Sequence, residues 1–426
     1  MLIAMLGMVP MAFMNGLVAF LLWGYTTVLT PKNYLFGFML DIRYNFIFAV
    51  IALGLLFLGK TRLSKEKVIL PKTYWLLVAF FIHANLSYFF GLEPNYLAAE
   101  RYGNFIKGFA FVLAVPFFAK DRQGIHSILA MLAIGLGMHG VIEGLKFIAS
   151  GGTHRVSGIG SSSLIDNNLF AIGMVIVLPT ILYFFNTLRH KYARYIAIAA
   201  TALVILSIIA TNSRGGFLAL AMLGVWYVIS SRRKGIAAFA LLLGVAMVIA
   251  VAPESWFDRI SSIETANDDH SFMNRVAAWR VSLSLGLSNP IFGGGFSAIN
   301  NFWIWDKYKD MPSIFSLDMS LYGPKAAHSI YFQVLGDMGV VGLLLFVSLL
   351  VTAYYNRKAI RAKVKESGRN DLVWAVDMAD SMFLSLFAFM VGGAGVSLPY
   401  YEMVYILIAL LAVLSTLVDK HIKAAT

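Results

Sequence analysis

Four short stretches of this 426-residue chain carry side chains that could do chemistry. Arg214 stands in "TNSRGG", and Arg275 and Arg280 stand in "NRVAAWR". A triple glycine occupies 293–295, and His328 opens an apolar run in "AHSIYFQ". The planar fork of arginine matches phosphate oxygens and stays charged at any working pH, whereas a neutral imidazole accepts a proton near neutral pH. Together these residues could bind an anion and supply a base, although each alone also suits a membrane interface.

The composition shows in what environment these residues must work. Hydrophobic residues make up 59% of the chain and charged residues only 13%, against about 25% in soluble domains. Apolar runs recur from end to end, so we expect an all-α, polytopic membrane protein in which 1–426 is a single membrane domain. The first run lacks a cleavage site, and we expect it to be retained as a span. Cysteine is absent, which excludes disulfides and thiolate chemistry.

Twelve apolar runs are each long enough to form a transmembrane helix. Pro10 and Asn15 interrupt the first of them, which leaves open whether it forms one helix or two short ones. The expected spans are approximately 2–28, 44–59, 74–91, 104–119, 126–149, 168–187, 192–211, 215–231, 235–252, 328–352, 378–396 and 402–418.

Basic residues concentrate in alternate connections, which predicts the orientation of the chain. By the positive-inside rule these connections and both termini face the cytoplasm, and this accounts for most of the net charge of +12 without nucleic acid as a partner. The basic segments are "KTRLSKEKVILPK" (60–72), "KDR" (120–122), "RHKYAR" (189–194), "RRK" (232–234), "RKAIRAKVKESGR" (357–369) and "DKHIK" (419–423).

The opposite, outer side holds one long connection, 253–327. A structureless loop of this length is improbable in a compact protein, so we expect short helices within it. The stretch "SFMNRVAAWRVSLSLGL" at 271–287 has apolar residues at helical spacing and predicts an amphipathic helix on the membrane surface. "NPIFGGGF" then breaks this helix. Its glycines favour a turn, because no strand precedes them as a P-loop or dinucleotide site requires.

Other polar groups favour structural roles. The cluster "NDDH" at 267–270 could hold a divalent ion, but adjacent acids point in different directions, so no metal site is predicted. Glu143 and Lys146 are three residues apart and can pair on one helix face. Asp337 lies nine residues into its span, a position that favours contact with a buried helix partner over contact with substrate. No G-x-S-x-G elbow of a hydrolase occurs in the chain.

Three of the stretches quoted above resemble, in order and topology, the O-antigen ligase and polymerase superfamily of bacterial envelope glycosyltransferases. They are "TNSRGGFLAL" (211–220), "NRVAAWRVSLSLGLSNPIFGGGFSAIN" (274–300) and "AHSIYFQVLGDMGVVGLLLF" (327–346), which together define a catalytic block at about 211–346. The N-terminal half, including "GGTHRVSGIGSSSLIDNN" at 151–168, resembles the O-glycosylation ligase branch.

The resemblance implies a GT-C-like glycosyltransferase of lipopolysaccharide biosynthesis that needs neither metal nor cofactor. Its donor would be a glycan on undecaprenyl diphosphate, and its acceptor a sugar hydroxyl of lipid A-core, at the periplasmic face of the inner membrane. By the same resemblance His328 is the catalytic base, and Arg214 and Arg275 bind the diphosphate. Candidate substrate-binding residues are Arg280, which has no clear family counterpart, Arg155 and Glu402.

The chemistry of the residues agrees with this assignment and leaves alternatives open. Without a metal site, arginines must neutralise the leaving diphosphate, and the acceptor hydroxyl needs a base. One base and no nucleophile predict a single, inverting displacement. A polymerase or a protein O-oligosaccharyltransferase would use the same donor chemistry. A lipid-linked sugar flippase is disfavoured, because the chain shows no repeated halves and its charges cluster at one face.

Overall fold

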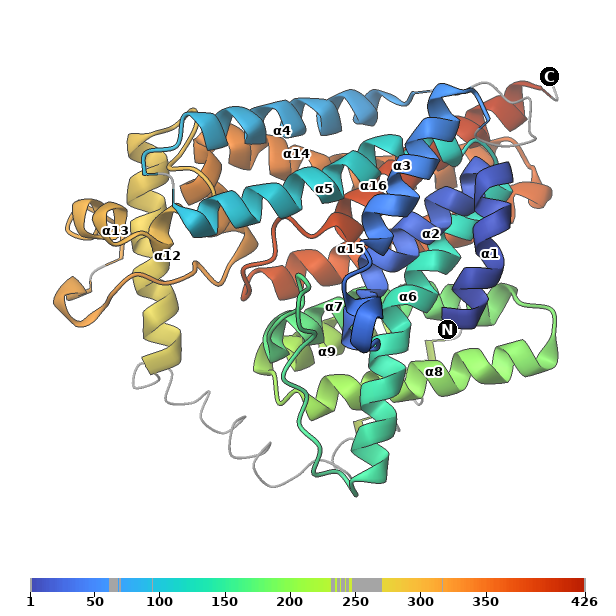
Figure 1. The fold of residues 1–426 in the computed structure, drawn as a ribbon, viewed down its shortest axis with the longest axis horizontal. Helices are drawn as coiled ribbons and strands as arrows, with labels where there is room; N and C mark the ends of the chain where they lie inside the picture. Colours follow the sequence, from blue (N-terminus) through green and yellow to red (C-terminus); the bar gives the residue numbers. More distant parts are fainter. Residues whose placement is uncertain are drawn as a thin grey trace.

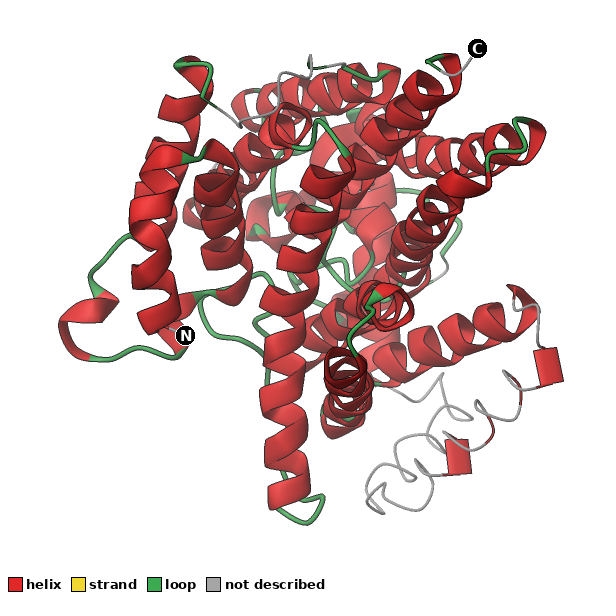
Figure 2. Cartoon of the chain, turned by 90° about the vertical axis from the view of Figure 1, so that its right-hand side faces the viewer, coloured by secondary structure: helices red, strands yellow, loops and turns green. Residues whose placement is uncertain are grey.

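In the computed structural model the described residues are 2–60, 68, 70–93, 95–230, 234, 235, 238, 242, 245, 246, 270–315 and 317–424. Every regular element within these ranges is a helix (Figure 2). This confirms the all-α fold class. Most of the predicted span 235–252 and all of 253–269 lie outside the described residues.

The predicted spans coincide with helices to within a few residues at most ends. The exceptions are α5, which begins eight residues before its predicted start, and α14, which continues well past its predicted end. The helices are α3 (Tyr44–Phe57), α4 (Lys72–Phe89), α5 (Tyr96–Phe118), α6 (Arg122–Ala149), α7 (Asn167–Thr187), α8 (Lys191–Ala210), α9 (Arg214–Ser230), α14 (Ile330–Glu366), α15 (Val373–Gly393) and α16 (Glu402–Lys423). Short 3₁₀ helices are η1 (Pro31–Asn33), η2 (Gly37–Leu40), η3 (Ala298–Asn300), η4 (Met319–Leu321) and η5 (Asn370–Leu372).

The first apolar run forms two helices, α1 (Leu2–Met14) and α2 (Gly16–Leu29). Asn15 separates them with an extended backbone, and its side chain accepts a hydrogen bond from the Leu17 N–H at 3.0 Å. Asparagine caps helices in this way by competing with the helical backbone pattern. The single span 2–28 is therefore wrong, and the alternative of two short helices is confirmed. Pro10 lies inside α1 and does not end it.

Six helices among the described residues are long and apolar enough to cross a membrane. They are Arg122–Ala149, Asn167–Thr187, Lys191–Ala210, Ile330–Glu366, Asn370–Gly393 and Glu402–Lys423. Helices α2, α3 and α9 are apolar but shorter. These helices make the chain a multi-pass membrane protein, while the count of twelve spans stays a prediction.

Helices α4, α14, α5 and α16 run alongside one another, and one further helix crosses their ends (Figure 1). This crossing helix is α12 (His270–Ser288), with the short α13 (Phe302–Tyr308) beside it. The predicted helix at 271–287 is confirmed. We refer to this part of the molecule as the α12 end.

A break in α14 anchors the glycine turn that follows α12. Gly339 has φ 69° and ψ −171°, so the carbonyls before it lose their helical partners. The N–H groups of Gly294 and Gly295 donate to the carbonyls of Gly336 and Asp337, both at 2.9 Å. A Cβ at Gly293 would lie 2.5 Å from the Gly339 nitrogen, so only glycine fits there. The triple glycine is thus a turn, as predicted, and all three of its amides bind backbone carbonyls, that of Gly293 the carbonyl of Asn289 at 2.9 Å.

Asp337 lies on the same broken turn and is buried. Its carboxylate accepts hydrogen bonds from the Tyr400 hydroxyl at 2.8 Å and the Ala298 N–H at 3.2 Å. Asp337 therefore binds protein partners, as predicted, but Tyr400 comes from the connection between α15 and α16 and not from a helix. Because a buried carboxylate is costly without partners, Asp337 ties three distant segments together at the α12 end.

Candidate active site at the mouth of α14

His328 lies two residues before α14 in a strained backbone conformation. Its φ is 46°, the left-handed region that few non-glycine residues adopt. The His328 N–H donates to the Ser397 hydroxyl at 2.8 Å, a contact between segments 69 residues apart. Strain of this kind costs about 1–3 kcal/mol and persists only where the surroundings hold it. The α15–α16 connection therefore holds the histidine at the mouth of α14.

Trp279 fixes α12 to the residue preceding this histidine. Its indole N–H donates to the Ala327 carbonyl at 2.8 Å, and its ring stacks on Phe332 with centroids 5.2 Å apart. Arg275 lies four residues earlier on α12 and therefore on the same helix face. The half-buried Arg275 is close enough to His328 for its charge to lower the histidine pKa. The structure thus brings two of the predicted site residues together.

Arg214 begins α9, and the turn before it packs on the start of α7. The Ser213 hydroxyl donates to the Asn168 side-chain oxygen at 2.8 Å, and the Asn167 amide donates to the Thr211 carbonyl at 3.0 Å. Asp166 caps α7 one residue before Asn167. Since the charge of Asp166 raises the pKa of His328, the start of α7 lies near both the Arg214 turn and the histidine.

The pKa of His328 is lowered relative to an ordinary histidine. Burial of the ring is the largest cause, followed by the positive charge of Arg275, while Asp166 acts in the opposite direction and Lys325 adds to the lowering. A lowered pKa keeps the imidazole neutral at neutral pH. His328 can therefore accept a proton there, which is what a general base must do.

A glycine-rich end of α15 allows these elements to converge. Gly393 packs against Ile330 at the start of α14, where a Cβ would lie 2.6 Å from the side chain. A Cβ at Gly395 would lie 3.5 Å from a guanidinium nitrogen of Arg275. Sequence reasoning missed this segment, although the run "GGAG" at 392–395, closing an apolar helix, was the available signal.

Two family models match the chain. Residues 199–347 match the model described as O-Antigen ligase. This match supports the resemblance to the O-antigen ligase superfamily. The match covers Arg214, Arg275 and His328, together with the block predicted at about 211–346. Residues 1–189 match a family of unknown function, DUF5935, and no curated protein sequence matches the chain.

The O-antigen ligase domain implies a glycosyltransferase-type ligase that acts on lipid-linked glycan and lipid acceptor substrates in general. Within this domain the Arg280 side chain binds backbone carbonyls of the same chain. Its guanidinium donates to the carbonyls of Phe315 at 2.9 Å, Leu317 at 3.0 Å and Met311 at 3.3 Å. These bonds attach the segment after α13 to α12. The structure therefore places Arg280, the third predicted arginine, against this segment.

Glu402 lies outside the O-antigen ligase domain, at the start of α16, and lines a cavity of about 440 Å³. The Glu402 side chain packs against Gly108 of α5, where a Cβ would lie 3.1 Å from it. Ser397, the residue that holds His328, lines the same cavity, whereas Arg214 and Arg275 do not. The cavity therefore reaches the residue that binds the His328 amide, and the two arginines are not part of its lining.

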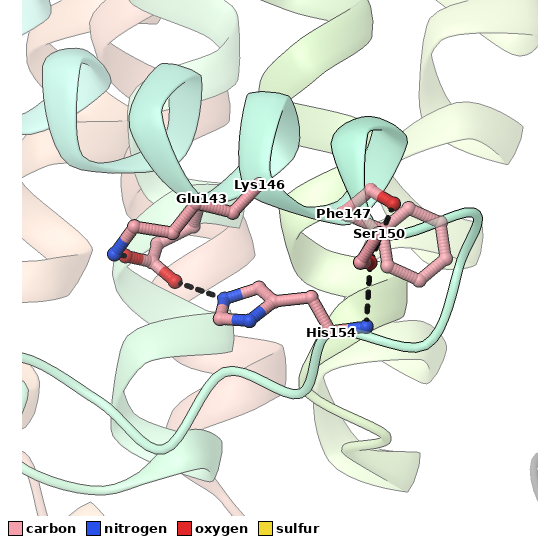
Figure 3. Close-up of polar contacts among 5 residues, drawn as sticks. All are labelled: Glu143, Lys146, Phe147, Ser150 and His154. Atoms are coloured by element: carbon pink, nitrogen blue, oxygen red, sulfur yellow. Dashed lines mark hydrogen bonds and ion pairs between the residues drawn. The ribbon is translucent and has the colours of Figure 1, made fainter.

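Arg155 is exposed in the connection between α6 and α7, one residue after His154 of the cluster that Figure 3 shows. Glu143 bonds Lys146 and His154, each at 2.6 Å, and the His154 N–H donates to the Ser150 hydroxyl at 2.8 Å. The predicted Glu143–Lys146 pair is confirmed, whereas His154 was not foreseen. The cluster secures the start of the connection that ends at Asp166.

We expect Ser397→Ala to lower turnover by about fivefold to tenfold, because the His328 amide loses a hydrogen bond worth about 1 kcal/mol. The Michaelis constant for donor should not change, since the arginines are untouched. Ser397→Thr keeps the hydroxyl and should restore most of the rate. Equal turnover in the alanine variant and the wild type, measured in proteoliposomes, would show that this bond does not hold the histidine.

Proposed function

We propose that the chain is an O-antigen ligase of lipopolysaccharide biosynthesis. It transfers a glycan from undecaprenyl diphosphate to a sugar hydroxyl of lipid A-core at the periplasmic face of the bacterial inner membrane. The observation that carries the proposal is the convergence of a neutral, backbone-constrained His328 with Arg275 at the mouth of a membrane helix, inside an O-antigen ligase domain.

In this mechanism the acceptor oxygen attacks the anomeric carbon of the donor glycan, and its proton passes to the imidazole of His328. The bond between the anomeric carbon and the diphosphate oxygen breaks, and the diphosphate leaves with the electron pair. Arg214 and Arg275 stabilise the negative charge that develops on this leaving group, so no metal is required. A single displacement inverts the anomeric configuration.

Reconstitution with a defined undecaprenyl diphosphate glycan tests the proposal. Purified protein is given lipid A-core, an acceptor protein or a second donor molecule, each with and without excess chelator. We expect a glycosylated lipid A-core product whose yield does not depend on chelator. Product only on protein would make the chain a protein O-oligosaccharyltransferase, and product only on a second donor would make it a polymerase.

The proposed orientation places the α12 end in the periplasm and the connection after α14 in the cytoplasm. The chain has no cysteine, so Ser288→Cys and Asn370→Cys each introduce one label site, and both positions are exposed. In intact cells with a permeabilised outer membrane, an impermeant thiol reagent should label Ser288→Cys and leave Asn370→Cys unmodified. Labelling of Asn370→Cys under these conditions would reverse the orientation.

A further inference from the structure

The cavity beside Ser397 has a lining suited to a ligand rich in hydroxyl groups. Neutral side chains such as Asn104 and Ser162 stand beside charged Lys107 and Glu402, with aromatic rings at Phe105 and Tyr400. A sugar presents hydroxyls that both donate and accept hydrogen bonds, and this lining offers both kinds of partner. Its volume of about 440 Å³ lies within the range of small-molecule sites.

The polar face of α5 supports a ligand site at this place. Glu100, Arg101, Asn104 and Lys107 all line the cavity, at positions that share one side of the helix. Among the described residues, neither Arg101 nor Lys107 forms an ion pair. A few polar and charged side chains that converge on a cavity are typical of a ligand site.

The cavity also adjoins the residue that holds His328 without being lined by Arg275. Arg275 neighbours Gly395, whereas Ser397, two residues on, lines the cavity and holds His328. In a single displacement the attacking hydroxyl and the leaving group stand on opposite sides of the anomeric carbon. If Arg214 and Arg275 bind the diphosphate, the acceptor must bind elsewhere. The cavity, which neither arginine lines, is available for it.

We propose that this cavity is the acceptor subsite and that it binds a sugar of the acceptor, not a protein side chain. The proposal rests on the proposed function and adds to it the place and the residues that bind the acceptor sugar. Asn104 and Lys107 of α5 and Glu402 of α16 bind hydroxyls of that sugar, and Ser397 connects the site to the base.

Asn104→Trp tests the proposal by filling the cavity from an exposed position. Ala99→Trp is the matched control, because Ala99 is exposed on the same helix and does not line the cavity. We expect Asn104→Trp to raise the Michaelis constant for lipid A-core about tenfold or more and to leave that for donor unchanged. Ala99→Trp should behave as the wild type. A rise in the donor constant, or equal behaviour of the two variants, would overturn the proposal.

A binding measurement separates this proposal from the proposed function. Core oligosaccharide freed of its lipid is titrated into His328→Gln protein, with and without Asn104→Trp, so that no turnover is needed. We expect binding that Asn104→Trp weakens about tenfold or more. No binding, or binding insensitive to Asn104→Trp, would overturn the acceptor subsite. Binding of the expected kind beside a wild type that transfers no glycan would overturn the proposed function alone.

Discussion

Replacing His328 with alanine is expected to lower turnover by about 100-fold or more, the usual contribution of a positioned acid or base. The acceptor hydroxyl would then have no group to take its proton as it attacks. Donor binding should persist, because the arginines that are proposed to hold the diphosphate come from α9 and α12. Turnover and donor binding are measured separately in proteoliposomes, with protein levels matched.

His328→Gln is the sharper version of the same experiment. Glutamine keeps hydrogen-bonding capacity at the helix mouth but cannot accept a proton near neutral pH. If His328 only caps a membrane helix, this variant should transfer glycan at a near-normal rate. That result would remove the base from the mechanism and direct attention to Glu402, which lines the adjoining cavity.

The pH profile gives an independent test of the base. Only the neutral imidazole accepts a proton, so activity should fall as pH drops through the pKa of His328. Because that pKa is lowered, the acid limb should lie below the pH of about 6.5 at which an ordinary histidine titrates. Residual activity of His328→Ala should lack this limb. An unchanged limb in the variant would assign the titration to another group.

Arg275→Ala is expected to cost about tenfold to a hundredfold in transfer, the scale of one lost hydrogen bond to a charged group. The guanidinium would stabilise the diphosphate as charge develops on it, and this contribution is greatest in the transition state. Lysine should restore the rate poorly, since an ammonium cannot reproduce a two-pronged contact with phosphate oxygens. Arg214→Ala should behave similarly. Normal turnover in both alanine variants would remove the arginines from the mechanism.

Arg275 and His328 are also coupled through charge. This coupling predicts a change in the pH profile that weaker donor binding would not produce. The positive charge of Arg275 lowers the pKa of His328. Arg275→Ala should therefore raise that pKa and shift the acid limb to higher pH. Arg275→Lys keeps the charge and should leave the limb in place while the rate stays low. Identical limbs in all three proteins would contradict the proximity of the two side chains.

Much of the fold could be predicted because membrane helices are specified locally. The helices α3, α6, α7 and α8 begin and end within four residues of the predicted runs. A hydrocarbon environment leaves backbone amides no partner except within the helix, so apolar length alone predicts the span. The break at Asn15 was only partly foreseen, since a capping side chain competes with the helix by a small free energy.

The composition and the spacing of apolar residues determined the class of protein and the positions of most helices. Residue type and the resemblance to a known family, and not apolar spacing, singled out His328, Arg214 and Arg275. Only the tertiary structure decided how these candidates are held. The Ser397 contact spans 69 residues and the Tyr400–Asp337 contact spans 63, and no local pattern encodes a partner so distant. Arg280 illustrates the same limit: its residue type suits phosphate and backbone carbonyls equally, and its place in the fold selected the carbonyls of the segment after α13.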